Sequence, residues 1–266
     1  MLTHERVVSV QGQAIWSPAW HDWAHAAPAL RGDPVAAAGA PRRPAPTVLA
    51  ANERRRAPDA VRMALQVAQD ACAAAGVDPA ALPSVFTSAH GDLAIVDALC
   101  RTLAHNPLLL SPMRFHHSVH NAASGYWAIG CRSHEASTAV AGGAHSWATG
   151  LLEALTQTAA DERAVLLVGS DTEAMGPLQS VNHSRGLLAA ALVLAPATAS
   201  GRRLAWSLRD GPCSPSPLCS AAAQALQSNA LADALPLFEA LAQRQPARLT
   251  LPLSATLALQ LQLDAA

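Results

Sequence analysis

The cysteines are the first candidates for a catalytic role, because the thiol of cysteine is the most nucleophilic side-chain group in the sequence. The five cysteines are odd in number, widely spaced and set among apolar residues: Cys72, Cys100, Cys131, Cys213 and Cys219. A secreted disulfide framework has paired spacing, so this pattern predicts free thiols in a reducing cytoplasm. Cys100 and Cys131 are the thiol candidates, but we expect Cys100 in an apolar helical stripe, where burial raises the thiol pKa and makes it inert.

Three histidines, His116, His117 and His120, fall close together and raise the question of a metal site. We expect an extended segment over residues 114–119, and adjacent residues of a strand point to opposite faces. No acidic or thiol residue stands at a matching spacing for a metal. The sequence therefore predicts no metal and no cofactor, and it favours histidines that are hydrogen-bonded in an interface, with substrate contacts as the alternative.

Other catalytic signatures are missing. Lys is absent and Arg supplies the fixed positive charge, which excludes a Schiff-base lysine, a pyridoxal-phosphate anchor and a phosphate-loop lysine. Ser124 precedes Gly125, but no Gly-x-Ser-x-Gly turn occurs, so a serine hydrolase is disfavoured. The pair Gly142-Gly143 follows an expected strand but falls short of a dinucleotide-binding fingerprint, and tight packing is the interpretation we favour.

Length and composition describe a globular chain. Its 266 residues are 51% hydrophobic, enough to bury a large core, and we expect one domain over residues 1–266. The net charge of -1 gives no attraction to nucleic acid or to an anionic membrane. The sequence has neither an export signal nor a run of about eighteen apolar residues, so we expect a cytoplasmic protein without a membrane span.

Strand and helix patterns alternate along the chain. Short β-branched or continuous apolar runs predict strands at residues 7–15, 84–88, 137–141, 164–169 and 187–194. Apolar residues at three- and four-residue spacing predict helices at residues 58–75, 91–104, 122–133, 145–159 and 218–243. Continuous apolar strands are typical of a sheet covered on both faces, so we expect an α/β fold with a layered α/β/α core.

Three further segments shape this picture. Residues 31–46 are rich in Pro, Ala and Gly and predict a loop. Residues 249–263 carry an apolar side chain at every second position and predict one strand, which Pro252 places at an edge of the sheet. Trp16, Trp20 and Trp23 form an early cluster for which we favour core packing over the cap of a hydrophobic tunnel.

Residues 114–130, RFHHSVHNAASGYWAIG, combine an expected strand, a tight turn of small residues and a helix. In a condensing enzyme this arrangement places a cysteine at a helix N-terminus, where the helix dipole and free N–H groups favour the thiolate. The segment resembles the N-terminal half of the β-ketoacyl synthases, whose Thr-Ala-Cys-x-Ser-Gly pattern is similar to HNAASG at residues 120–125. The resemblance places Ala122 where such an enzyme carries its cysteine.

More narrowly, the chain resembles the β-ketoacyl synthase-like chain length factors of aryl polyene, flexirubin and xanthomonadin-type pigment pathways. The matching segments are IWSP at 15–18 with Trp23, RRR at 54–56, VFTS at 85–88, HGD at 90–92, LSP at 110–112, Phe115 and SVHNAASG at 118–125. This resemblance covers nearly the whole chain. It implies a thiolase-like fold, N-terminal half only, with a mixed sheet.

The same resemblance implies a function. A full-length β-ketoacyl synthase has a second half with two histidines that help to decarboxylate the malonyl carrier, and we expect this chain to end before that half. Alanine at position 122 forms no acyl thioester. The resemblance therefore implies a pseudoenzyme, a chain-length-factor-like partner of an active β-ketoacyl-ACP synthase in a heterodimer or higher assembly, working in aryl polyene or polyketide-type fatty acid biosynthesis.

By the same resemblance, a stretch of this chain lines the partner interface and the end of the product tunnel: Phe115, His116, His117, His120, Asn121, Ala122, Ala123 and Ser124. Arg54, Arg55 and Arg56 are implied as a contact for the acyl carrier protein, although anchoring a helix start is the interpretation we favour. One alternative is a stand-alone acyl-thioester condensing or acyl-transfer enzyme that uses another nucleophile. Another is a structural scaffold with no role in a tunnel.

Overall fold

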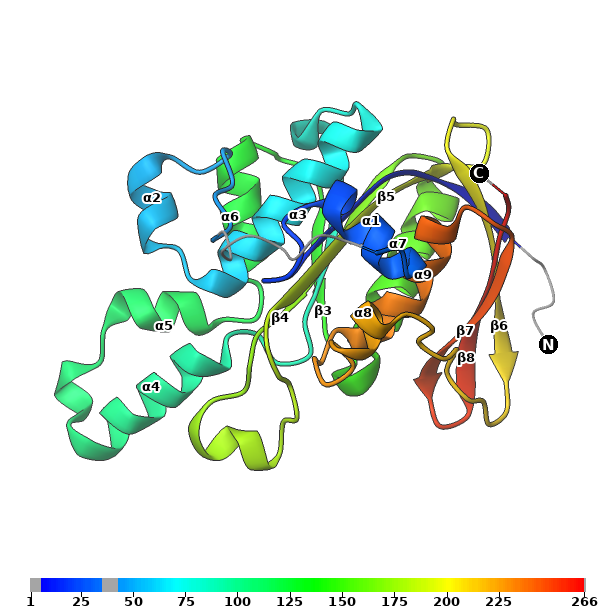
Figure 1. The fold of residues 1–266 in the computed structure, drawn as a ribbon. Coiled ribbons are helices and arrows are strands. Elements are labelled where there is room, and N and C mark those ends of the chain that lie inside the picture. The colour runs from blue at the N-terminus through cyan, green and yellow to red at the C-terminus, as the bar shows by residue number, and fades with distance from the viewer. Residues whose placement is uncertain (1–5, 35–42, 266) are drawn as a thin grey trace.

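The structure is a computed structural model that describes residues 6–34 and 43–265, and an eight-stranded mixed sheet runs through its centre (Figure 1). The strand order is β3-β2-β4-β5-β1-β6-β8-β7. The strands are β1 (Arg6–Trp16), β2 (Ser84–Thr87), β3 (Ser137–Val140), β4 (Val165–Asp171), β5 (Leu188–Pro196), β6 (Arg202–Asp210), β7 (Ala247–Ser254) and β8 (Leu257–Leu263). β2 pairs in parallel with β3 and β4, and the other neighbours are antiparallel.

Helices cover both faces of this sheet. The α-helices are α1 (Trp23–Arg31), α2 (Ala51–Arg56), α3 (Asp59–Ala75), α4 (Leu93–His105), α5 (Pro112–Ser118), α6 (Ala122–Cys131), α7 (Ser146–Asp161), α8 (Ala221–Gln224) and α9 (Leu235–Gln243). On β5, Leu192 and Leu194 pack on the side of α1, α7 and α9, whereas Ala191 and Val193 pack on the side of α3 and α6. The continuous apolar runs form strands because both faces are buried, which confirms the layered α/β prediction.

Short 3₁₀ turns connect several of these elements: η1 (Pro79–Ala81), η2 (Pro107–Leu109), η3 (Gly143–His145), η4 (Gly176–Ser180) and η5 (Ala232–Ala234). Together α4, η2 and α5 form an arm that projects at one end of the molecule, at the lower left of Figure 1. Within residues 6–34 and 43–265, no helix has the length and apolar character needed to cross a membrane.

Nine of the predicted elements agree with the structure within two residues at each end, from the strand at 7–15 to the strand at 187–194. α3 shows why the agreement is good. Its apolar positions are buried against the sheet, and Gly76 ends it in the left-handed conformation at φ +67°, which glycine adopts without steric cost.

The strand predicted at residues 114–119 is wrong, because residues 114–118 belong to α5 and Val119 is its C-cap. Ser111 is the N-cap of this helix and its Oγ accepts a hydrogen bond from the Arg114 N–H at 3.4 Å, while Pro112 occupies the first turn. A serine followed by proline is a helix-start signal, and here it overrides the β-branched and aromatic residues that follow.

The helix predicted at residues 218–243 is also wrong as one element, because α8 and α9 are separated by turns and η5. The interruption places Asn229, a buried side chain, next to the end of β4. Its Nδ2 donates to the carbonyl oxygens of Asp171, Arg185 and Gly186 at 3.1–3.3 Å. Satisfying buried carbonyl groups therefore competes successfully with a continuous helix.

At the C-terminal end, the single strand predicted over residues 249–263 is a hairpin of β7 and β8. The two-residue connection between Ser254 and Leu257 preserves the alternation of apolar residues, so the pattern alone does not reveal the turn. β7, which contains Pro252, is the edge strand, as predicted. β6 was not predicted, because its charged and polar residues obscure the alternation.

The remaining two predictions concern the early part of the chain. A loop was predicted at residues 31–46. Residues 32–34 and 43–46 contain no helix or strand, whereas Arg31 is the last residue of α1. Residues 35–42 lie outside the described part of the chain. Trp16 and Trp20 are buried, and Trp23 packs edge-on against Phe238 with ring centroids 6.0 Å apart. This arrangement supports core packing for the cluster.

Candidate functional site

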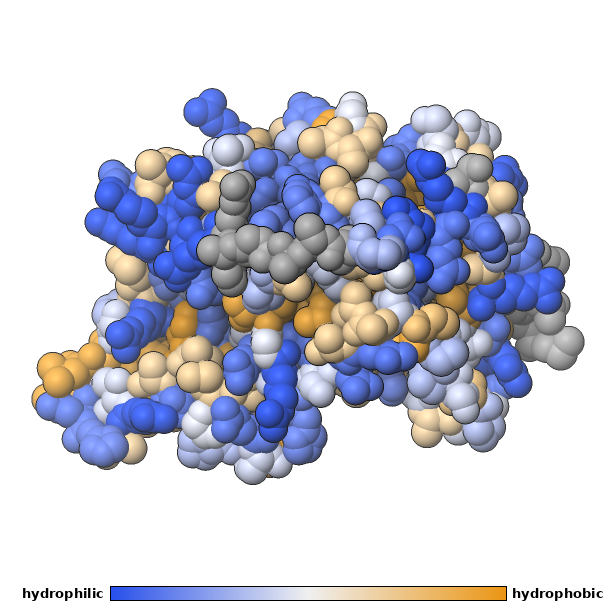
Figure 2. Space-filling model, viewed as in Figure 1, coloured by the Kyte–Doolittle hydropathy of each residue, from blue (hydrophilic) through white to orange (hydrophobic). Residues whose placement is uncertain are grey.

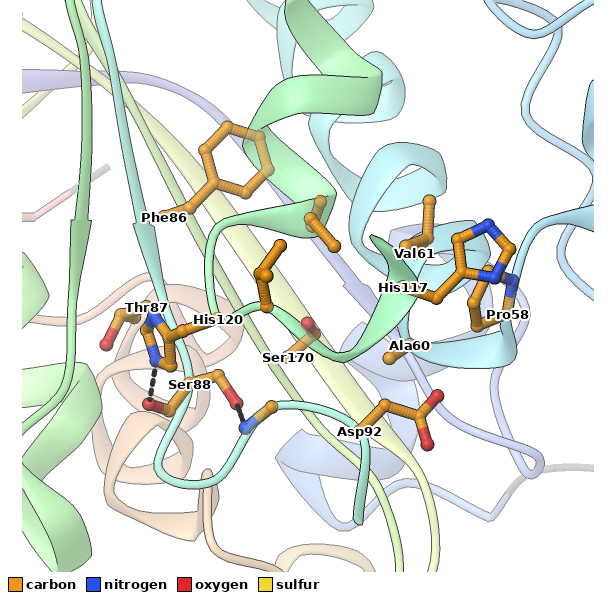
Figure 3. A pocket seen from close by; sticks show the side chains of 14 residues that line it. Pro58, Ala60, Val61, Phe86, Thr87, Ser88, Asp92, His117, His120 and Ser170 are labelled. Atoms are coloured by element: carbon orange, nitrogen blue, oxygen red, sulfur yellow. Dashed lines mark hydrogen bonds between the residues drawn. The ribbon is translucent and has the colours of Figure 1, made fainter. Parts of the chain in front are cut away.

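A small cavity lies where the end of β2, the turn before α4 and the α5–α6 connection meet (Figure 3). Its volume of about 30 Å³ has room for about two water molecules. The predicted site residues His117, His120, Ala122 and Ala123 all line it. The sequence therefore identified one wall of this cavity, although α5 forms part of that wall in place of the expected strand.

The polar side of the cavity is a chain of hydrogen bonds. His120 Nε2 donates to the Ser88 carbonyl oxygen at 2.9 Å, as Figure 3 shows. Ser88 Oγ donates to Asp171 Oδ1 at 2.6 Å and accepts from the Gly91 N–H at 2.8 Å. Because the His120 ring contacts the carbonyl and not Oγ, and because Ser88 gives its proton to a carboxylate, the group lacks the serine–histidine contact of an activated nucleophile.

Asp171 ties the turn after β2 to the end of β4. Both of its oxygens accept from the Ala89 N–H at 3.0 Å, and the carboxyl group is buried. Burial raises the pKa of Asp171, and the hydrogen bond from Ser88 opposes that change. The sequence did not identify either residue as part of a site: Ser88 stood only within the matching segment VFTS at 85–88, and Asp171 is the last residue of the buried strand β4.

His117 separates the small cavity from a larger one. It is buried, and its Nε2 is hydrogen-bonded to the Tyr126 hydroxyl at 2.8 Å. Burial lowers the pKa of His117 and the neighbouring His116 adds to this, while Asp92 acts in the opposite direction. Asp92 caps α4 by accepting from the Ile95 N–H at 3.0 Å, and burial raises its pKa. A neutral imidazole at pH 7 therefore divides the two spaces.

The larger cavity has a volume of about 670 Å³ and shares Pro58, Asp92 and His117 with the small one. Both apolar and charged side chains line it, among them Arg43, Arg56, Asp59, Ala94, Ile95, Ala98, Met113, Arg114, Glu173, Met175 and Leu187. A third cavity of about 220 Å³ shares Leu187 with it and continues to Trp16. The adjoining spaces therefore extend from Trp16 to Ala122.

The other predicted site residues lie outside the small cavity. Phe115, His116 and Asn121 are exposed and are not among its lining residues. Ser124 is buried, and its Oγ donates to the Asn121 carbonyl oxygen at 3.0 Å within the first turn of α6. These four residues belong to the surface and to the helix start, with no contact to the cavity.

The three arginines of α2 divide in the same way. Arg56 lines the larger cavity, whereas Arg54 Nη1 donates to the Pro46 carbonyl oxygen at 3.2 Å and Arg55 bonds to Asn52. The side chains of Arg54 and Arg55 thus stabilise the local structure.

Among the residues that the structure describes, no group of three His, Cys, Asp or Glu side chains is arranged to hold a metal ion.

The strand–turn–helix junction expected at Ala122 lies elsewhere, because residues 112–118 are helical. The chain forms such a junction where β3 is followed by Gly142, Gly143 and α7. A Cβ at Gly142 would lie 2.3 Å from Thr149 Oγ1, so packing requires glycine there, as we expected. Gly143 has φ +58° and open space around it, so its reason for being glycine is conformational. No cysteine stands at this junction.

A carboxylate occupies the N-terminus of α7. Asp233 Oδ2 accepts from the Ala148 N–H at 3.1 Å, and its Oδ1 is buried without a hydrogen-bond partner among the described residues. Burial raises the pKa of Asp233 to about 7, and the nearby Asp171 adds to this. The helix N-terminus that would stabilise a thiolate is therefore already used by a residue of η5.

The cysteines do not supply a nucleophile at either place. Burial raises the pKa of Cys72 to about 12 and that of Cys131 to about 11. Cys100 is exposed on α4, so the prediction that it is buried in an apolar stripe is wrong. α4 belongs to the projecting arm, and the face that carries Cys100 meets no core.

The fold is a layered α/β arrangement with a mixed sheet, and the junction between β3 and α7 carries no cysteine. The family model described as "Beta-ketoacyl synthase, N-terminal domain" matches residues 20–254. The chain therefore belongs to the β-ketoacyl synthase N-terminal domain family, and its fold is thiolase-like. A search of curated proteins finds no match.

Three solved structures resemble the fold over nearly all of both chains. A ketosynthase (ApeO) in complex with its chain length factor (ApeC) from Xenorhabdus doucetiae has a TM-score of 0.71 at 20% identity, covering 96% of this chain and 99% of that one. The type II PKS complex AntDE:AntF, an acyl-carrier protein with its ketosynthase bound to the hexaketide, has 0.75 at 12%, covering 99% and 100%. The ishigamide ketosynthase/chain length factor has 0.68 at 17%, covering 98% and 99%.

Proposed function

We propose that this chain is a non-catalytic, chain-length-factor-like partner of an active β-ketoacyl-ACP synthase in aryl polyene or polyketide-type biosynthesis. It supplies part of the subunit interface and lines the far end of the product tunnel. The observation that carries this proposal is a set of large apolar side chains exposed to water on the arm and on α6.

These side chains form the apolar arm surface, which we define as Leu103, Leu108, Leu109, Met113, Phe115, Val119 and Ile129. Leu108 is 94% exposed and Ile129 is 73% exposed. Figure 2 shows apolar atoms at the tip of the arm. Exposed apolar surface of this kind marks a site of association, and a ketosynthase subunit would cover it.

β3 offers a second element of the interface. It pairs only with β2 in the described part of the chain, so the backbone groups along its other side have no strand partner. Ser137 and Ala139 are exposed on this strand. An open strand edge next to α6 supports association by addition of a strand from the partner.

The loss of catalysis is best assigned to the β3–α7 junction. The earlier assignment to Ala122 required a strand before it, and the structure has α5 there. We place the lost nucleophile at Gly142 or Gly143, and Asp233 takes up the α7 N–H that would favour a thiolate. Ala122 keeps its role as a small residue in the wall of the small cavity, which adjoins the 670 Å³ cavity where we place the end of an elongated product.

The proposed assembly also includes the acyl carrier protein, which contacts fewer residues of this chain than the ketosynthase does. Arg56 borders the 670 Å³ cavity, and among the described residues its side chain forms neither a hydrogen bond nor an ion pair. We assign any contact with the acidic carrier to Arg56 more than to Arg54 or Arg55, whose guanidinium groups already bind local oxygen atoms.

The test is co-expression with the candidate ketosynthase, followed by co-purification and analysis of product length. Ile129→Glu should abolish co-purification, because it places a charge on the apolar arm surface that we propose the ketosynthase covers. Val181→Glu is the matched control, since Val181 is 70% exposed but lies outside the apolar arm surface. A chain that stays monomeric beside the ketosynthase, or products of unchanged length when it is omitted, would refute the proposal.

A stand-alone condensing or acyl-transfer enzyme makes a different prediction. Such an enzyme forms a covalent acyl intermediate on its nucleophile. Incubation with a fluorescent acyl thioester should leave this chain unlabelled while the ketosynthase in the same sample is labelled. Stoichiometric labelling of this chain would favour the enzyme.

A further inference from the structure

The 220 Å³ cavity lies where β1 ends, beside the first turns of α3. Trp16 pairs with Ala189 across β1 and β5, and Leu187 directly precedes β5, so the ends of these two strands form one wall. Separate parts of the chain contribute its apolar lining residues, which are Trp16, Pro18, Pro44, Met63 and Leu187. The cavity therefore presents apolar surface on several sides.

The charges at this cavity balance. Among the described residues that line it, only Arg43 and Asp59 are charged. Arg43 Nη2 lies 2.7 Å from Asp59 Oδ1, and Arg43 Nε donates to the same oxygen at 2.8 Å. A charged ligand would lose its hydration here without meeting an unpaired charge of opposite sign. The cavity therefore suits an uncharged group.

The wall that contains Pro44 is fixed to α3 by hydrogen bonds. The buried Arg62 donates from Nε to the Pro44 carbonyl oxygen at 3.0 Å. The next N–H along the chain, that of Ala45, donates to Gln66 Oε1 at 3.1 Å. Together with the ion pair of Arg43, these bonds hold three successive residues against the helix, so this wall of the cavity is defined by specific contacts.

The cavity joins the 670 Å³ cavity at a boundary of three residues. Arg43, Asp59 and Leu187 line both spaces. The side chains of the ion pair are 65% and 43% exposed, so the charged groups stay in water while the methylene groups of Arg43 cover apolar surface. Leu187 is partly buried and is the apolar residue of this boundary. A chain lying in the larger cavity therefore enters the smaller one beside Leu187.

We propose that the 220 Å³ cavity receives the uncharged hydrocarbon terminus of the product, which continues into it from the 670 Å³ cavity, and that Leu187 limits the length that fits. Each methylene group placed against Trp16 and Met63 leaves water, whereas a polar terminus would lose its hydrogen bonds with water and find no partner. This inference rests on the proposed function for the identity of the chain. It adds the place of the terminus and the residue that limits it.

The first test is calorimetric titration of the full chain with 1-hexanol, 1-heptanol and 1-octanol. The Kd should fall about fourfold for each added methylene group. The decisive comparison is 1,8-octanediol, which has a hydroxyl group at both ends. It should bind about tenfold more weakly than 1-octanol or worse, because one hydroxyl must enter the apolar cavity. Absence of saturable binding of 1-octanol, or an equal Kd for the diol, would overturn the inference without the need for a variant.

The second test places a larger side chain at the boundary. Leu187→Trp should raise the Kd of 1-octanol tenfold or more, because the indole ring occupies the passage. Leu178→Trp is the matched control, since Leu178 is also a partly buried leucine of the β4–β5 connection but lines neither cavity. An equal Kd for the wild type and Leu187→Trp would show that the alkanol binds elsewhere and would refute the site.

Co-expression with the candidate ketosynthase separates this inference from the proposed function. Leu187→Trp should co-purify like the wild type, because Leu187 is not part of the apolar arm surface, and it should shorten the products. Products of wild-type length from Leu187→Trp, beside altered products when the chain is omitted, would overturn the inference alone. Unaltered products on omission would overturn the proposed function, whereas the alkanol titrations report on the cavity of the isolated chain.

Discussion

Asp233→Asn tests whether a buried carboxyl group at the N-terminus of α7 makes the stability of the chain depend on pH. The pKa of Asp233 is raised from 3.8 to about 7, chiefly by burial. A carboxyl whose pKa is higher in the folded state holds its proton there, so its favourable contribution is complete below pH about 4 and is lost as the pH rises through about 7. Three pH units at about 1.4 kcal/mol each give an upper limit of about 4 kcal/mol.

Asparagine keeps the shape and can still accept the Ala148 N–H, but it has no proton to lose. Urea unfolding, followed by tryptophan fluorescence from pH 4 to pH 8, should show the variant becoming more stable than the wild type as the pH rises, with the difference largest at pH 8. Asp210→Asn, at an exposed position in β6, serves as the control and should show no such change. Parallel pH profiles for the wild type and Asp233→Asn would refute the reasoning.

Three further results are expected. Phe115 is 59% exposed, so a partner that covers its side chain of about 200 Å² would bury about 120 Å². This burial contributes at most about 3 kcal/mol to the binding free energy. Phe115→Ala should therefore raise the Kd for the ketosynthase ten- to about a hundredfold, as measured by calorimetry. Gly142→Ala should lower the free energy of unfolding by about 1–3 kcal/mol through the clash with Thr149, and Thr149→Ala should restore part of it in urea unfolding. A maleimide should label Cys100 within minutes and Cys72 only after unfolding, as mass spectrometry would show.

The sheet and its covering helices were predictable because burial on both faces leaves a simple pattern. Continuous apolar runs at β4 and β5 and the three- and four-residue spacing in α3 follow directly from that environment. The errors lie where local hydrogen bonds or turns decide the structure. Ser111 and Pro112 start α5 within a segment that suggests a strand, and the short turn between β7 and β8 leaves the alternation of leucines unbroken.

The candidate site was only half predictable, because its parts come from distant segments. His117, His120 and Ala122 belong to one stretch and were found by its resemblance to a known pattern. Ser88 and Asp171 are 83 residues apart, and nothing in either local sequence shows that the two side chains share a hydrogen bond. The contact of Asp233 with the Ala148 N–H of α7 is still harder to predict. It forms only because the helix predicted at residues 218–243 is interrupted between α8 and η5.

Our proposal that the nucleophile position is the β3–α7 junction, and not Ala122, changes what the loss of a nucleophile would mean for function. A single alanine in place of a cysteine could be reversed by one substitution. At the β3–α7 junction, by contrast, Gly142 has no room for a side chain, Gly143 has a left-handed backbone, and the carboxylate of Asp233 already binds the start of α7. Several independent features would have to change before a thiolate could form and be stabilised there, whereas the exposed apolar residues of the arm need only a partner subunit to be buried. These features support our proposal that this chain retains association and not catalysis.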